Sequence, residues 1–272
     1  MTRRLMRAFR LAYDGQPYYG FQRQPDVATV EDALFDALRG LGILGADRSK
    51  PAGYAAAGRT DAGVSALRQT VAFACPEWCT PRALNAELPA DVRAWASADV
   101  PSGFHATHDA SARTYTYFLH APDADPERAG RALDALSGTH DFHNLTSDRE
   151  NTTRAIEPDL TVDGPVLVCR LRAGGFSQQL ARRIVSLVRA VAVGERPFSH
   201  VERVLSTEAL DGPAGIGPAP AYPLVLSGVE YPDLDFETDD EAATSARERF
   251  EARRIEHGTR ARVAGTVADG IR

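Results

Sequence analysis

One short stretch of the chain combines a carboxylate with two glycines, an arginine and a threonine. It reads Ala57-Gly58-Arg59-Thr60-Asp61-Ala62-Gly63-Val64. An aspartate is already ionised at neutral pH, so its side chain can act as a covalent nucleophile. Glycines on either side allow the backbone of another molecule to approach closely. The pattern therefore indicates a reactive carboxylate, Asp61, in an accessible loop.

The same residues also fit a structural role. Asp61 would then cap a turn or a helix, and Gly58 and Gly63 would only supply positive φ angles. Whether Asp61 is catalytic or structural, the residues around it predict where the loop lies in the fold. An apolar run ends at Ala57 and another begins at Gln69, which predicts a strand on each side and a loop presented by a rigid sheet.

The rest of the first half predicts the elements that hold this loop. Residues 7–14 alternate as in a strand, and apolar residues after Thr29 recur at helical spacing. Thr29 is a suitable N-cap for that helix. Pro81 opens a second, short helix, and residues 92–100 predict a further strand. The resulting order, βαββαβ, is a split-βαβ pattern.

The second half predicts the same order of elements without a visible sequence repeat. A strand alternates over 112–119, and apolar residues from Phe176 to Val191 fall on one helical face. Further elements are a helix over 126–136 and strands over 156–162, 166–171 and 222–231. We expect an α+β fold with two ferredoxin-like halves joined into one extended mixed or antiparallel sheet. Helices should cover one side of that sheet, leaving the other side for a binding cleft.

Changes in composition mark the expected boundaries. Pro101-Ser102-Gly103 separates the halves, and apolar residues become rare near the C-terminus. We expect an N-terminal half over 1–103 that carries the Asp loop, a C-terminal half over 104–232, and a charged tail over 233–272. The tail is expected to be helical over 241–256 and mobile in its last dozen residues.

Composition limits the cellular context. The 272 residues contain no apolar run long enough to span a membrane, and the N-terminus lacks the apolar core of a secretory signal. The three cysteines, Cys75, Cys79 and Cys169, are an odd number in a long chain. A disulfide framework is not expected, and the cytoplasm is the predicted location.

The net charge of −6 does not by itself favour a polyanionic partner. However, Lys50 is the only lysine among the 31 basic residues. The others are arginines, which bind phosphate bidentately and stack on bases. Acidic residues concentrate over 233–241, so a basic cleft is compatible with an acidic exterior. The scarcity of lysine fits either a salt-rich cytoplasm or a GC-rich genome.

The segment from Gly58 to Ala66 resembles the catalytic motif of the TruA family of tRNA pseudouridine synthases. The resemblance extends from about Arg7 to Glu237. It includes Tyr13-Asp14-Gly15, Tyr19–Gln24, Phe104-His105-Ala106, Ser111–Tyr117, His140-Asp141-Phe142, Phe176–Val185 and Leu224-Val225-Leu226. It implies an enzyme that isomerises uridine to pseudouridine with no cofactor and no metal.

The resemblance also implies catalytic roles. Asp61 is the nucleophile, and attack at ribose C1′ and at uracil C6 both remain open. A carboxylate enclosed by protein and a base needs a nearby cation to stay ionised. The resemblance assigns that cation to Arg182, which lies on the polar face of its predicted helix. The alternative for Arg182 is a solvated surface arginine.

Three further residues are implied to contact the substrate. Tyr115 matches the family's active-site tyrosine, which stacks on the target base. Because Tyr117 has the same strand parity, one of the two belongs to the core. Arg59 is placed to fill the gap left by a flipped base or to hold its phosphate. Arg23, with Gln22 beside it, matches the family's N-terminal signature and is expected to face RNA.

Some positions depart from the family pattern. Ser65 stands where family members commonly have histidine, Gln178 and Gln179 stand where two histidines are usual, and Arg183 replaces an asparagine. None of these is the expected nucleophile, tyrosine or paired arginine. The departures affect the finer RNA contacts rather than the chemistry.

The family resemblance implies specific partners. It implies a homodimer in which one tRNA contacts both protomers, without membrane association. The implied targets are uridines of the anticodon stem-loop, at about positions 38 to 40 of the tRNA. Recognition would be mainly by shape and phosphate contacts rather than by base sequence.

Two other functions remain open from the sequence. The pairs His105-x-x-His108 and His140-x-x-His143 could assemble a metal site for phosphoester hydrolysis. Alternatively, two ferredoxin-like halves could form a non-catalytic RNA-binding module. The substitution Asp61→Ala separates an enzyme from a pure binder, because only an enzyme has an activity to lose.

Overall fold

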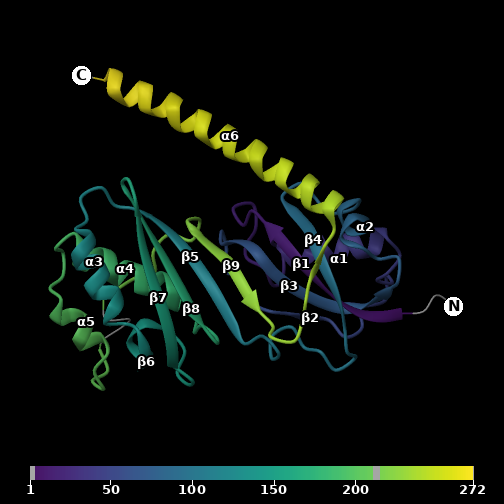
Figure 1. Cartoon of the computed structure of the whole chain (residues 1–272), viewed down its shortest axis with the longest axis horizontal. Helices are drawn as coiled ribbons and strands as arrows, with labels where there is room; N and C mark the ends of the chain where they lie inside the picture. Colours follow the sequence, from purple (N-terminus) through teal and green to yellow (C-terminus); the bar gives the residue numbers. More distant parts are fainter. Residues whose placement is uncertain (1–3, 211–214, 272) are drawn as a thin grey trace.

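The computed structural model describes residues 4–210 and 215–271. Within these residues, ten strands form one sheet in the order β10-β4-β1-β3-β9-β5-β8-β7-β6, with β2 paired to β3. The N-terminal half contains β1 (Arg4–Tyr13), α1 (Val30–Gly40), β2 (Ala55–Ala56), β3 (Ser65–Pro76), α2 (Pro81–Asn85) and β4 (Val92–Val100). Figure 1 shows these elements on one side of the molecule and the second half on the other.

The C-terminal half has the same core order. It contains β5 (Ala112–His120), α3 (Pro126–Asp134), β6 (Gly138–Asp141), the short 3-10 turn η1 (His143–Leu145), β7 (Thr153–Asp163), β8 (Val166–Ala173), α4 (Leu180–Ala192), α5 (Ser199–Val204) and β9 (Leu224–Glu230). The strand orders β4-β1-β3-β2 and β9-β5-β8-β7 are equivalent. Each half is therefore a split βαβ unit, which confirms the predicted fold class.

The two halves join through strands β3 and β9. Ser65 and Ala66 pair in parallel with Val225 and Leu226, whereas the other strand pairs described are antiparallel. The Asp61 loop directly precedes β3. The sheet therefore places this loop at the seam between the halves.

Each half has its own apolar core. Phe9 of β1 stacks on Phe73 of β3 with ring centroids 5.0 Å apart, under Leu34 and Leu38 of α1. In the second half, Leu187 and its apolar neighbours on α4 pack on β5 and β8. Burial of these side chains supplies the main driving force for holding the strands in place.

The cleft was expected on the helix-free side of the sheet, but it does not lie there. Tyr115 and Tyr117 share one face of β5, and Tyr117 lies in the core beneath α4. Tyr115 and the first residues of α4 line the same cleft. The cleft therefore opens on the helix-covered face, beside the N-terminus of α4.

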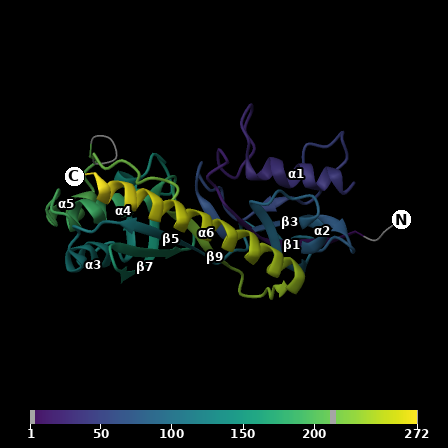
Figure 2. The same cartoon turned by 90° about the horizontal axis from the view of Figure 1, so that it is seen from above.

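The tail differs from its prediction. After β10 (Glu237–Thr238), helix α6 (Asp240–Gly270) continues well past Glu256, through residues expected to be mobile. Asp239 caps the helix, and ion pairs such as Arg254–Glu251 support its exposed turns. Figures 1 and 2 show α6 running diagonally across the molecule, on a different side of β1 and β3 from α1. No helix among the described residues combines the length and apolarity required to cross a bilayer.

Candidate active site

Asp61 lies in the loop between β2 and β3, with its side chain 34% exposed. The residues on either side of it are anchored to the sheet. The hydroxyl groups of Thr60 and the buried Tyr13 are 2.7 Å apart, and the Gln69 side chain donates to the carbonyl of Gly58 at 2.8 Å. These bonds fix the backbone of the loop and leave the carboxylate of Asp61 facing the cleft.

A second loop, residues 14–21, supports the Asp61 loop. Two hydrogen bonds join it to the Asp61 loop, Phe21 N to Thr60 O at 3.0 Å and Gly63 N to Tyr18 O at 3.2 Å, and a third joins Gly15 N to Ser65 Oγ, at the start of β3, at 3.1 Å. Ser65, one of the departures from the family pattern, therefore fixes the backbone of the 14–21 loop by accepting this hydrogen bond. Within the chain, close backbone approaches to this loop occur at Gly15 and Gly20.

Gly15→Ala is expected to destabilise the protein. A Cβ atom at Gly15 would lie 2.1 Å from the carbonyl oxygen of Val64, which is backbone and cannot rotate away. Overpacking of this kind costs about 1–3 kcal/mol or more. Urea unfolding measures the loss. As a control, Gly258→Ala in the exposed part of α6 meets no atom within 4 Å and should stabilise the chain slightly. Equal stability of the wild type and Gly15→Ala would contradict the packing described.

Arg182 reaches Asp61 from the other half of the chain. Its Nη1 atom lies 3.0 Å from Asp61 Oδ2, and its Nε donates to the carbonyl of Ala219 at 2.7 Å. The Arg182 side chain is only 14% exposed. The guanidinium therefore has a fixed orientation and forms a charge-assisted hydrogen bond to the carboxylate. The predicted pairing of Arg182 with Asp61 is therefore present, and Arg182 is not a solvated surface arginine.

The entry to α4 is built by residues that depart from the family pattern. Gln178 accepts hydrogen bonds from Thr146 and Ser147 and donates its backbone N–H to Asp148. Gln179, at φ 59°, adopts the left-handed conformation just before the helix. The Arg183 guanidinium donates to Ile216 O and to Gln179 Oε1. These side chains hold the start of the helix, and so the position of Arg182.

Tyr115 lies in β5 and lines the same cleft as Asp61. Phe176 packs edge-on against its ring, with centroids 5.0 Å apart. The sequence pattern placed Phe176 on the apolar face of the helix, but it lies before α4, which begins at Leu180. Burial, and then the nearby Asp61 charge, raise the pKa of Tyr115 to about 12, so its phenol is neutral at physiological pH. Tyr117 is the core member of the pair and donates to Pro220 O.

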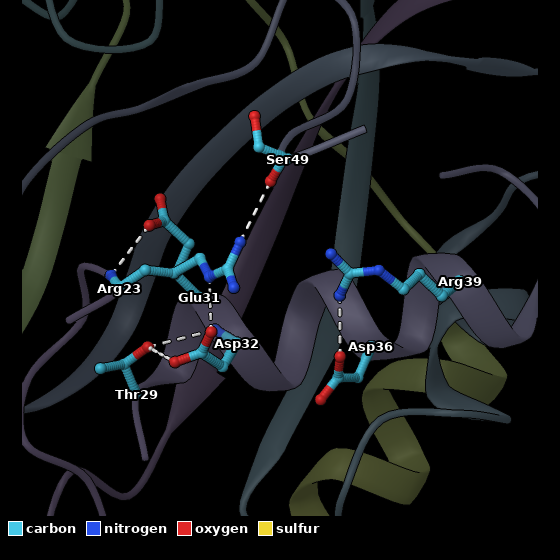
Figure 3. Close-up of polar contacts among 7 residues, drawn as sticks. All are labelled: Arg23, Thr29, Glu31, Asp32, Asp36, Arg39 and Ser49. Atoms are coloured by element: carbon cyan, nitrogen blue, oxygen red, sulfur yellow. Dashed lines mark hydrogen bonds and ion pairs between the residues drawn. The ribbon is translucent and has the colours of Figure 1, made fainter. Parts of the chain in front are cut away.

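The two arginines expected to contact RNA occupy different positions. Arg59 is exposed and lines both the main cleft and a smaller pocket beside it. Arg23 lines only the smaller pocket. Its guanidinium pairs with Asp32 of α1 at 2.5 Å and donates to Ser49 O, as Figure 3 shows. It also lies over the ring of Phe35. Arg23 is thus bound by the chain itself at the rim.

Arg113 is a buried residue of the site that the sequence analysis did not identify. Its guanidinium donates to the carbonyl groups of Ala57, Thr107, Ala110 and Gly174. It therefore ties together three loops beneath the cleft. A charged residue within an alternating strand, at the same parity as Tyr115, was the available signal.

The cleft has a volume of about 1330 Å³ and is lined by both halves. This exceeds the range of about 300–1,000 Å³ that is usual for small-molecule pockets. The rings of His105 and His108 lie 4.2 Å apart, tilted by 34°, and line the cleft, whereas His140 and His143 lie on and beside β6. Within the described residues, no three His, Cys, Asp or Glu side chains are grouped to hold a metal ion. The size of the cleft suits part of a polymer.

A large open cleft with an arginine-paired aspartate and a neutral tyrosine is the arrangement expected of an enzyme that acts on a nucleic acid base. A family model described as tRNA pseudouridine synthase matches residues 132–232. A tRNA pseudouridine synthase A from Haloarcula marismortui is 58% identical over 98% of this chain and 100% of its own. One from Natronomonas pharaonis is 57% identical, covering 97% and 99%, and one from Methanothrix thermoacetophila is 40% identical, covering 85% of each.

The chain belongs to the tRNA pseudouridine synthase A, or TruA, family, and it is therefore a pseudouridine synthase, an isomerase. Among solved structures, one chain of an archaeal box H/ACA sRNP Nop10–Cbf5 complex is similar over 69% of this chain and 43% of its own. The TM-score is 0.37 and the identity 13%.

Proposed function

We propose that the protein converts uridine to pseudouridine in the anticodon stem-loop of tRNA, at positions 38 to 40, without a cofactor. Asp61 is the nucleophile. The observation that carries the proposal is the 3.0 Å contact between Asp61 and Arg182 in a cleft that Tyr115 also lines. The family's name supplies tRNA as the substrate class.

The reaction breaks the bond from ribose C1′ to uracil N1 and forms a bond from C1′ to C5. Asp61 attacks either C1′ or C6, and its bond to the substrate breaks again before release. The proton lost from C5 is balanced by the one gained at N1, so the product is an isomer. Arg182 stabilises the carboxylate before attack and after release. No redox step occurs.

The target uridine must leave the helical stack to reach Asp61. Tyr115 offers a neutral aromatic face for the base, and stacking of this kind contributes about 1–3 kcal/mol per base. Arg59, exposed at the cleft, then fills the vacated position or holds the adjacent phosphate. Arg23 contacts RNA at the rim if it exchanges its bond to Asp32 for a phosphate.

The oligomeric state and the cellular location are proposed by analogy with the family. The protein acts as a homodimer in which one tRNA contacts both protomers. A cytoplasmic location is supported by the three cysteines, which are free and buried. Light scattering of the purified protein, alone and with tRNA, tests the dimer: a monomer in both samples would remove that part of the proposal.

Incubation with unmodified tRNA tests the proposed reaction. The buffer contains no added cofactor or divalent metal, and pseudouridine is mapped by carbodiimide treatment followed by primer extension. Modification is expected at uridines 38, 39 or 40. Transcripts with cytidine at all three positions should remain unmodified. Modification elsewhere in the tRNA, or a requirement for added metal, would refute the corresponding part of the proposal.

A further inference from the structure

Helix α6 contacts two carboxylates through one arginine. Arg253 pairs with Asp14, and its Nη2 atom lies 3.9 Å from Asp91 Oδ2. The side chains of Asp14 and Asp91 are only 14% and 16% exposed. Two carboxylates held together and away from water repel each other, and a cation beside both offsets this repulsion. Arg253 supplies that cation from more than 150 residues further along the chain.

Other charges near this contact have other partners. Arg93 lies two residues after Asp91 and interacts with it electrostatically, but its guanidinium makes its hydrogen bonds to the carbonyl groups of Asn85 and Leu88. Arg249, one turn before Arg253, is a further cation near Arg93, but no ion pair joins it to Asp14 or Asp91 among the described residues. Arg254, the next residue of α6, pairs with Glu251 on the helix itself. Among the described residues, Arg253 is therefore the cation that forms ion pairs with both Asp14 and Asp91.

Asp14 belongs to the loop that supports the catalytic loop, and Asp91 contacts that supporting loop. Asp14 begins the 14–21 loop, and its backbone N–H donates to Asp91 O at 3.0 Å. The hydroxyl of Tyr18 donates to Asp91 Oδ1 at 3.1 Å, while the carbonyl of Tyr18 accepts from Gly63 N at 3.2 Å. Burial and the adjacent Asp91 raise the pKa of Tyr18, so it remains a donor.

A continuous set of contacts thus runs from α6 to the site. It passes from Arg253 through Asp91 and Tyr18 to Gly63, two residues from Asp61. The backbone of the 14–21 loop approaches the Asp61 loop so closely that a Cβ at Gly20 would lie 2.9 Å from Thr60 O. Displacement of one loop therefore displaces the other.

We propose that Arg253 is a positioning residue for catalysis: it fixes the 14–21 loop through Asp14 and Asp91, and this loop fixes the Asp61 loop against Arg182. The inference rests on the proposed catalytic role of Asp61. It assigns a function in the reaction to the C-terminal helix, which lies outside the two halves that form the cleft.

The test compares Arg253→Met with Arg254→Met. Arg253→Met keeps an unbranched chain in place of the aliphatic part of arginine and leaves the two carboxylates without their ion-pair partner, so the loop should shift. A shift of this size should lower kcat by about tenfold or more, since a misplacement of about 1 Å can cost a hundredfold. KM for tRNA should stay within about threefold, because the RNA-facing residues are unchanged. Arg254→Met, which breaks only a pair on the exposed helix, should match the wild type.

A second substitution separates positioning from other roles. Asp91→Asn removes one of the two charges but keeps an oxygen that can accept from Tyr18. Added to Arg253→Met, it should restore a large part of the lost kcat. Arg253→Lys, which keeps the charge, should lie between Arg253→Met and the wild type. Thermal unfolding of each variant shows whether the folded fraction accounts for the change.

The outcomes are distinct. A kcat of Arg253→Met equal to that of Arg254→Met would overturn the inference. So would a rise in KM alone, which would make α6 an RNA-binding arm, or a loss of kcat that Asp91→Asn does not relieve. Asp61→Asn is assayed in parallel. If Asp61→Asn retained activity, the proposed function would fail, whereas an inactive Asp61→Asn with a fully active Arg253→Met would refute only the role of Arg253.

Discussion

Asp61→Asn is expected to reduce pseudouridine formation by at least about a thousandfold, to below detection in most assays. Asparagine has nearly the same shape as aspartate and fits the same loop, but it has no anionic oxygen with which to attack C1′ or C6. Single-turnover reactions with enzyme in excess over tRNA measure this effect without a contribution from substrate binding. Filter binding then measures the affinity for tRNA, which should change by only a few fold.

A matched substitution shows that the loss is specific to this carboxylate. Asp159→Asn breaks an exposed ion pair with Arg170 on the neighbouring strands β7 and β8. It should leave both rate and affinity unchanged, because exposed pairs contribute little. Rates for Asp61→Asn within about tenfold of the wild type would refute the assignment of Asp61 as the nucleophile.

The elements closest to Asp61 were predictable because their signals are local. An apolar run before the loop and another after it correctly indicate strands on both sides, and helical spacing before Val191 correctly indicates α4. Local periodicity reports which face of an element is buried. It also places Arg182 on the polar face of α4, from which the observed contact with Asp61 is made.

The features that were missed depend on contacts between distant residues. Nothing in the sequence near Gly15 or Gly20 indicates that these glycines lie against the Asp61 loop. For Arg113, strand parity shows the face that it shares with Tyr115, but not the three loops that the fold brings around its guanidinium. The cleft was expected on the wrong side of the sheet because strand parity shows which residues share a face, but not which face the helices cover.

The length of α6 was underestimated for a related reason. Apolar residues are rare beyond Asp233, and a segment without an apolar stripe does not normally form a packed helix. However, Asp239 caps this helix, and Arg254–Glu251 and Arg260–Glu256 pairs support it along its length. Arg253 attaches the helix to the body through Asp14 and Asp91. Among the described residues, that last contact connects α6 with the 14–21 loop beside the site.

Arg182→Met is expected to lower the rate of pseudouridine formation by about a hundredfold or more, which is the usual cost of removing an electrostatic partner from an active site. The substitution removes the hydrogen bond to Asp61 and leaves the carboxylate without its counter-charge. Arg182→Lys retains the charge but cannot contact Asp61 and Ala219 together, so its rate should be intermediate. Arg189→Met on the same helix, which breaks an exposed pair with Glu195, is the control and should behave as the wild type.

Combining the two substitutions decides whether Arg182 acts through Asp61. If the arginine serves the carboxylate, its removal has no further effect once Asp61 is asparagine, and Asp61→Asn/Arg182→Met should be as slow as Asp61→Asn alone. Multiplicative losses would instead mean that Arg182 acts on the substrate independently, for example on the phosphate of the flipped nucleotide. Residual turnover in Asp61→Asn is the limiting quantity, so long single-turnover incubations with enzyme in excess over tRNA are required. Because Ala219 holds the guanidinium in place whether or not Asp61 is charged, the arginine should keep its position in Asp61→Asn. The comparison therefore measures chemistry rather than rearrangement.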